Sequence, residues 1–235
     1  MARILLLETA TEVCSAALSV GGEVTGYHER SDGFRHAELL TVFIDRLLSE
    51  TGTKAGELDA VCVSRGPGSY TGLRIGVSVA KGLCFALNIP LIAISSLQSM
   101  AAYVARNIDI LPVPWNHDLL LCPMLDARRM EIYTALFDRK GDQLTDISAR
   151  VIQEDSFSGE LENRQMVFFG SGASKCREVI RNAHAHFLSG IYASARFMSD
   201  LAEKSFNKKS FENVAYFEPF YLKDFIATVP KNKIF

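Results

Sequence analysis

The spacing of apolar residues predicts alternating strands and helices in the first half of the chain. Short apolar runs separated by Gly21-Gly22 predict a β-meander, and apolar residues then recur at i, i+3 and i+4, which predicts an amphipathic helix. A buried-type strand, a glycine-rich loop, a second helix and another strand follow as a βαβ unit with parallel strands. The predicted strands are 3–9, 14–20, 23–28, 59–64 and 91–94, and the predicted helices are 34–49, about 73–87 and 96–106.

The second half of the chain repeats this outline. A segment at 107–118, which holds two prolines and Trp115, predicts a crossing between two lobes. Three strands with a tight Lys140-Gly141-Asp142 turn come next, and a further strand, the loop Gly170-Ser171-Gly172 and a helix follow them. The predicted strands are 119–126, 130–138, 143–151 and 166–169, and the predicted helices are 174–187 and 193–206.

The repeated order predicts an α/β fold with two lobes of the same type. Each lobe is expected to be a mixed sheet in which a β-meander precedes alternating helices and strands. We place the N-terminal lobe at 1–106 and the C-terminal lobe at 107–192, and expect the closing helix and tail, about 193–235, to pack back on the first lobe. The aromatic run at 216–221 is predicted to be a packed tail rather than a base-stacking platform.

Composition narrows the class of protein. The chain is 48% hydrophobic and carries 25 basic and 27 acidic residues, so it furnishes apolar cores but no global field that would attract a polyanion. The first apolar run is too short for a signal peptide, and no stretch approaches the roughly 20 residues that span a bilayer, so a cytoplasmic location is expected. The cysteines lack CxxC spacing and are interpreted as reduced core thiols. They are Cys14, Cys62, Cys84, Cys122 and Cys176.

The loop from Arg65 to Gly76 carries the most informative motif. Its glycines allow another group to approach the backbone closely. Because the loop precedes a predicted helix, two interpretations are open: a strained turn with a Ser or Thr cap, or a site for an anion at the helix N-terminus. The spacing fits neither a Walker loop nor a GxGxxG fingerprint. The candidate loop residues are Arg65, Gly66, Gly68, Ser69, Thr71, Gly72 and Arg74.

The predicted helix at 73–87 is apolar over most of its circumference, because Arg74 and Lys81 lie on one stripe with Ser78. Such a helix must be covered on more than one side, either within this chain or by another subunit. We expect it to pair with a partner together with the helix at 34–49, and an Ala80→Arg substitution to block that pairing in a folded chain. The candidate contact residues are Leu39, Phe43, Leu47, Leu73, Gly76, Val77, Ala80 and Cys84.

Catalytic and metal-binding patterns are missing from the sequence. The histidines are isolated, apart from His184 and His186, whose spacing on a predicted helix would point them to different sides. There is no GxSxG elbow and no HExxH motif. We therefore predict no catalytic residue, no metal site and no independent enzymatic activity.

Several motifs resemble the TsaB (YeaZ) family. The run Arg-Gly-Pro-Gly-Ser-Tyr-Thr-Gly-Leu-Arg-Ile-Gly at 65–76 looks like the signature of that family, and four other segments agree in order. The resemblance spans roughly 3–175, with a departure at Glu8, where an aspartate is usual. The four segments are 4–11, 36–40, 126–133 and 170–173.

The resemblance implies a two-lobed actin/Hsp70-like (ASKHA) fold and a role in making threonylcarbamoyladenosine on ANN-decoding tRNAs. It implies an accessory scaffold that dimerises with and activates a catalytic TsaD-type subunit, is joined by a TsaE-type ATPase, and forms a homodimer in isolation. The resemblance then implies that the chain contacts tRNA only as part of the assembly. No cofactor is expected on this chain itself, although the resemblance leaves a place for ATP or ADP at a subunit junction.

Two alternatives keep the same fold. In one, the chain is an ATP-binding ATPase or phosphotransferase that acts on its own, with phosphate loops at 8–12 and 170–173. In the other it is an endopeptidase, an activity that rests on analogy alone. Calorimetry with ATP and magnesium, and cleavage of casein by a pure sample, separate these alternatives from the scaffold.

Overall fold

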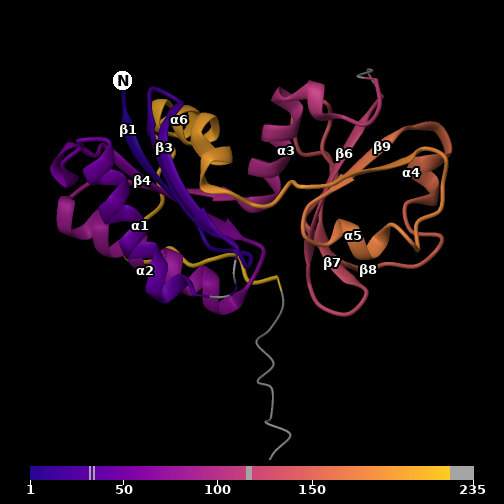
Figure 1. The fold of residues 1–235 in the computed structure, drawn as a ribbon, viewed down its shortest axis with the longest axis horizontal. Helices are drawn as coiled ribbons and strands as arrows, with labels where there is room; N and C mark the ends of the chain where they lie inside the picture. The colour runs from indigo at the N-terminus through magenta and orange to yellow at the C-terminus, as the bar shows by residue number, and fades with distance from the viewer. Residues whose placement is uncertain (32, 34, 115–117, 223–235) are drawn as a thin grey trace, which may run out of the picture.

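Two five-stranded mixed sheets form the framework of the molecule (Figure 1). The computed structural model describes residues 1–31, 33, 35–114 and 118–222; the expectations for Phe34, Trp115 and 223–235 lie outside these residues. The first half contains β1 (Arg3–Glu8), β2 (Cys14–Val20), β3 (Glu23–Arg30), α1 (His36–Glu50), η1 (Ala55–Glu57), β4 (Ala60–Gly66), α2 (Tyr70–Leu87), β5 (Leu91–Ser95), α3 (Ser96–Arg106) and η2 (Ile108–Ile110).

The second half supplies the other sheet and then returns to the first. Its elements are β6 (Leu120–Asp126), β7 (Glu131–Thr134), β8 (Ser148–Val151), α4 (Ser158–Asn163), β9 (Met166–Phe169), α5 (Ala173–Cys176), β10 (Ala185–Leu188), η3 (Ala195–Met198) and α6 (Ser199–Asn207).

The two sheets have the same topology. The first has the order β3-β2-β1-β4-β5 and the second β8-β7-β6-β9-β10. In each, the first three strands form an antiparallel meander and the last two join it in parallel. The shared topology confirms the predicted two-lobed actin/Hsp70-like fold. The residue boundaries of the two lobes stay a prediction.

Helices cover both faces of the first sheet (Figure 1). On one face, α1 and α2 pack on side chains such as Leu5, Leu7 and Val63. On the other, η3 and α6 bury the alternate strand residues, among them Ile4 and Leu6. Period-two alternation therefore gives this sheet two apolar faces, and the second cover arrives from the far end of the chain.

The second sheet is covered by α3 on one face and by α4 and α5 on the other. Of these, α3 follows β5 directly and packs on β6, so it links the lobes. All five cysteines are free and buried, as predicted for core thiols. Within the described part of the chain, no helix has the length and apolar character needed to cross a membrane.

One predicted helix is wrong. The segment 174–187 was expected to be helical, but α5 ends at Cys176 and Ala185–Leu188 form β10, which pairs in parallel with β9. The Asn182 side chain accepts a hydrogen bond from the His184 backbone N–H at 2.8 Å, an Asx turn that starts the strand. Pairing with the buried strand β9 thus prevails over the helical pattern of the segment.

Candidate functional site

The glycine-rich loop connects the end of β4 to the start of α2. Ser69 is the N-cap of α2, and its Oγ accepts a hydrogen bond from the Gly72 backbone N–H at 3.2 Å. The Ser69 backbone N–H in turn donates to the Ala10 carbonyl oxygen at 2.6 Å. Thr71, the other candidate cap, is exposed. Ser69 therefore acts as the cap that one of the two interpretations required, and its backbone is tied to the first loop of the chain.

Gly68 in this loop, and Gly72 and Gly76 in the first turns of α2, are needed because the loop after β1 lies against them. A Cβ atom at Gly68 would stand 2.1 Å from the Ala10 carbonyl oxygen, and one at Gly72 would stand 2.1 Å from the Thr9 carbonyl oxygen. At Gly76 it would stand 2.2 Å from the Thr9 Oγ1. The predicted close approach is thus an approach of the chain to itself, and the loop after β1 fills the space beside these glycines.

His36 secures the same loop from α1. Its Nε2 lies 2.8 Å from the Thr11 carbonyl oxygen, and because a carbonyl can only accept, Nε2 must carry the proton and donate. The ring is buried, and burial lowers the pKa of His36 despite this hydrogen bond. His36 is therefore a neutral structural residue that joins α1 to the loop.

Glu8, the last residue of β1, carries a fully buried carboxyl group. One side-chain oxygen accepts from the Ala10 backbone N–H at 2.7 Å and the other from the Ser96 hydroxyl at 2.8 Å. The residue has no exposed surface, and burial raises the pKa of its carboxyl group against the effect of those hydrogen bonds. Glu8 thus connects β1 to the start of α3.

Replacing Glu8 by glutamine should remove part of the pH dependence of stability. Since the pKa of Glu8 is raised above 4.5, the folded chain keeps a proton that the unfolded chain releases as the pH rises. Wild-type stability should therefore fall from about pH 4.5 upward until the raised pKa is passed, and the Glu8→Gln chain should lack this fall. Urea unfolding of both chains across this range measures the difference, and equal slopes would contradict it.

The residues predicted to touch a partner face the interior instead. Among them, seven are buried in this chain and Leu39 is half-buried. The amphipathic stripes of α1 and α2 pack on the first sheet, so a partner cannot reach these side chains without opening the core. For the same reason, the burial of Ala80 now favours the prediction that Ala80→Arg disturbs the fold itself. The seven are Phe43, Leu47, Leu73, Gly76, Val77, Ala80 and Cys84.

The outer face of α2 presents a different set of residues. Ser78, Gly82 and Phe85 share one stripe of the helix and are all exposed, and Phe85 is 85% exposed. A Cβ atom at Gly82 would meet nothing within 4 Å. Beside α2, α1 exposes Val42. This face combines a large exposed ring with small residues, and it is the part of the two helices that a partner can touch. Binding of a partner to this face stays a prediction.

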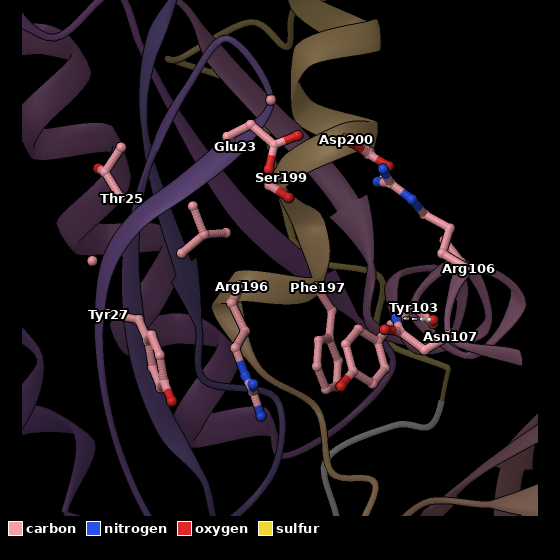
Figure 2. A pocket seen from close by; sticks show the side chains of 14 residues that line it. Glu23, Thr25, Tyr27, Tyr103, Arg106, Asn107, Arg196, Phe197, Ser199 and Asp200 are labelled. Carbon is pink, nitrogen blue, oxygen red and sulfur yellow. Dashed lines mark hydrogen bonds and ion pairs between the residues drawn. The ribbon is translucent and has the colours of Figure 1, made fainter. Parts of the chain in front are cut away.

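A groove that no sequence motif indicated lies on the opposite side of the first lobe, between β3, α3, η3 and α6 (Figure 2). Its volume is about 640 Å³. The Arg196 guanidinium lies 5.0 Å from the centre of the Tyr27 ring and 5.1 Å from that of Phe197, and Phe197 stacks on Tyr103 at 3.8 Å. These contacts fasten η3 to β3 and α3, so we interpret Arg196 as a structural residue.

The described histidines take part in no metal-binding cluster. Within the described residues, no three side chains of His, Cys, Asp or Glu gather in a way that could hold an ion. His186 lies in β10 and His184 just before it, so their spacing places them on the same side, contrary to the helical expectation. The His184 Nδ1 lies 2.8 Å from the Leu161 carbonyl oxygen, which ties the strand to α4.

The family model and the two relatives described here all carry names that refer to threonylcarbamoyladenosine in tRNA. The family model described as TsaD, tRNA N6-adenosine threonylcarbamoyltransferase, matches residues 27–231. The tRNA threonylcarbamoyladenosine biosynthesis protein TsaB of Escherichia coli K12 is 34% identical over 137 residues, which are 58% of this chain and 55% of that protein. The protein of the same name in Haemophilus influenzae is 29% identical over 236 positions, covering 94% and 93%. The match to the first relative thus spans about half of its length.

Two solved structures resemble the chain along nearly its whole length. An uncharacterized Pseudomonas aeruginosa protein with similarity to peptidase YEAZ superposes with a TM-score of 0.80 at 25% identity, covering 95% of this chain and all of that one. YeaZ from Pseudomonas aeruginosa gives a TM-score of 0.76 at 25% identity, with coverage of 94% and 100%.

Proposed function

The chain belongs to the TsaB (YeaZ) family of tRNA threonylcarbamoyladenosine biosynthesis proteins, and on that premise we propose that it is an accessory subunit of the assembly that makes this modified nucleoside. In this proposal it binds and activates a catalytic TsaD-type subunit and does not carry out the transfer itself. A TsaE-type ATPase, a homodimer of the isolated chain, and ATP or ADP at a subunit junction belong to the same proposal.

The observation that carries the proposal is the outer face of α2. A ring as large as Phe85, exposed on the same stripe as the open Gly82, is typical of a protein-binding surface, and the neighbouring helix α1 also exposes Val42. Small residues allow the backbone of a partner helix to come close, and the ring supplies apolar area that is buried on contact.

The geometry of the first lobe supports an accessory role over independent catalysis. The Glu8 carboxyl group is enclosed and bonded to Ala10 and Ser96, and the backbone of the glycine loop is bonded to the loop after β1. Both features use polar groups to hold the fold together. A residue whose hydrogen-bonding capacity is spent inside the fold is poorly placed to bind or activate a substrate.

The test is reconstitution with the TsaD-type subunit of the same organism. We expect a stable complex in size-exclusion chromatography with light scattering, and threonylcarbamoylation of tRNA only when both chains are present. Gly82→Arg should weaken the complex at least about 100-fold, because it places a long charged side chain in the middle of the contact. A matched control is Gly159→Arg, since Gly159 lies in α4 of the other lobe and a Cβ atom there also meets nothing within 4 Å.

The outcomes separate the alternatives. If the TsaD-type subunit is fully active alone, the activating role is wrong. If the Gly82→Arg chain still co-elutes with the partner as well as wild type does, the outer face of α2 is not the binding surface, whatever the activity.

A further inference from the structure

A C-terminal segment, residues 212–222, lies along α2, and we name it the strap (Figure 1). At its start, the Glu212 backbone N–H donates to the Leu91 carbonyl oxygen at 2.8 Å, which attaches it to the edge strand β5. Near its end, the Phe220 backbone N–H donates to the Arg65 carbonyl oxygen at 2.7 Å. The strap therefore spans α2 from β5 to the glycine loop.

Lys81 holds the middle of the strap. Its ammonium group donates to the Ala215 carbonyl oxygen at 3.0 Å and to the Phe217 carbonyl oxygen at 3.2 Å. Val214 and Phe217 pack against the core cluster under α2. Charged donors make stronger hydrogen bonds than neutral ones, so Lys81 fixes the strap backbone on both sides of Tyr216.

The far end of the strap is fixed by aromatic contacts. The Tyr221 ring lies 4.8 Å from the Tyr70 ring, and the Arg74 guanidinium lies 5.3 Å from the centre of the Tyr70 ring. The stripe of Arg74 and Lys81, which is unusual on an otherwise apolar helix, thus has a defined task in this fold. Both of its cations hold the strap or the ring that contacts it.

The strap brings a second exposed ring to the outer face of α2. Tyr216 is 84% exposed, and the carbonyl groups on either side of it are bound by Lys81. Phe85 lies one helical turn beyond Lys81 on the same side of α2. Lys81 thus joins the strap segment that carries Tyr216 to the helix that carries Phe85, and the exposed surface of α2 continues onto the strap.

We propose that the strap is part of the docking surface for the catalytic subunit, with Tyr216 as a contact and Lys81 as a positioning residue. This inference rests on the proposed function. Continuity of the surface supports the same occupant for both parts, since Lys81 attaches the strap directly to α2. Exposed aromatic rings held on a fixed backbone are the side chains that contribute most to protein interfaces.

Binding of the purified TsaD-type subunit to full-length variants tests the inference. Tyr216→Ala, which removes an exposed ring and leaves the core intact, should raise the Kd at least about tenfold. Lys81→Met should raise it similarly and also speed hydrogen exchange at the Glu212 and Phe220 amides, which a purely local contact would not do. Tyr192→Ala is the matched control, because Tyr192 is an exposed aromatic residue away from the strap and should leave the Kd unchanged.

Each result has a distinct meaning. If Tyr216→Ala and Lys81→Met bind like wild type while Gly82→Arg does not, the strap is outside the interface and the inference fails, but the proposed function stands. If wild type itself does not bind the TsaD-type subunit, the proposed function fails and the inference falls with it.

Discussion

Gly68→Ala should lower the melting temperature by about 6–20 °C, although it adds a single methyl group. The new Cβ atom would stand 2.1 Å from the Ala10 carbonyl oxygen, which is backbone and cannot rotate away. Separating the two loops would also break the hydrogen bond from the Ser69 N–H to that oxygen. We expect a loss of roughly 3–5 kcal/mol, at about 2–4 °C per kcal/mol for a chain of this size.

The matched control is Gly82→Ala on the exposed side of α2. Since a Cβ atom there meets nothing within 4 Å, the substitution should be neutral or stabilise the helix by up to about 1 kcal/mol. Thermal unfolding followed by circular dichroism compares the two variants. Equal melting temperatures would mean that the contact between the two loops is far looser than the structure shows.

Ala80→Arg should prevent folding, whereas Ala86→Arg should not. Ala80 has no exposed surface and lies in the cluster between α2 and the first sheet, so an arginine there overpacks the core and buries an unpaired charge. A cost of at least about 4 kcal/mol is a large part of the total stability of a typical domain. Ala86 is exposed, and arginine is a good helix former.

Soluble yield and the near-ultraviolet circular dichroism spectrum report on both variants. A folded Ala80→Arg chain that fails to bind the TsaD-type subunit would restore the original prediction that Ala80 lies on the partner surface. A folded Ala86→Arg chain is needed to show that the result depends on burial and not on the charge alone.

Elements with a strong period were predictable from the sequence. The meander, α1, α2 and α3 appear within a few residues of their predicted positions, because their apolar spacing matches one type of element and the neighbouring turns agree with it. The repeated order also predicted that the two sheets share a topology. In these segments, local preference and tertiary packing favour the same structure.

The direction in which a helix faces was harder to predict. The pattern of α2 shows that it is apolar nearly all round, but it cannot show which side its own sheet takes, so buried Ala80 and exposed Ala86 looked equivalent. The sequence predicted a tail packed on the first lobe, but not its course along α2, because Lys81 attaches it through backbone carbonyl groups, which carry no sequence signal. The helix expected at 174–187 failed because β10 depends on pairing with β9, a contact that a local pattern does not contain.

In the glycine loop, the close approach that the motif indicates is made by the chain itself. Three glycines before a helix indicate close approach, and the structure shows that the approaching group is the loop after β1. A prediction from sequence alone cannot distinguish a ligand from another part of the same chain, because both require a missing Cβ atom.

The way η3, α6 and the strap close the first lobe has a consequence for the order in which the protein is made. Residues of β1 and β4 lie beside Ala195, Met198 and Ala202 in one cluster, yet about 100 residues separate the end of β5 from η3. At roughly 5–20 residues per second, a ribosome needs about 5 to 20 s to supply this missing cover. During that time the first sheet exposes one apolar face, and the nascent chain is most exposed to aggregation before the second lobe is complete.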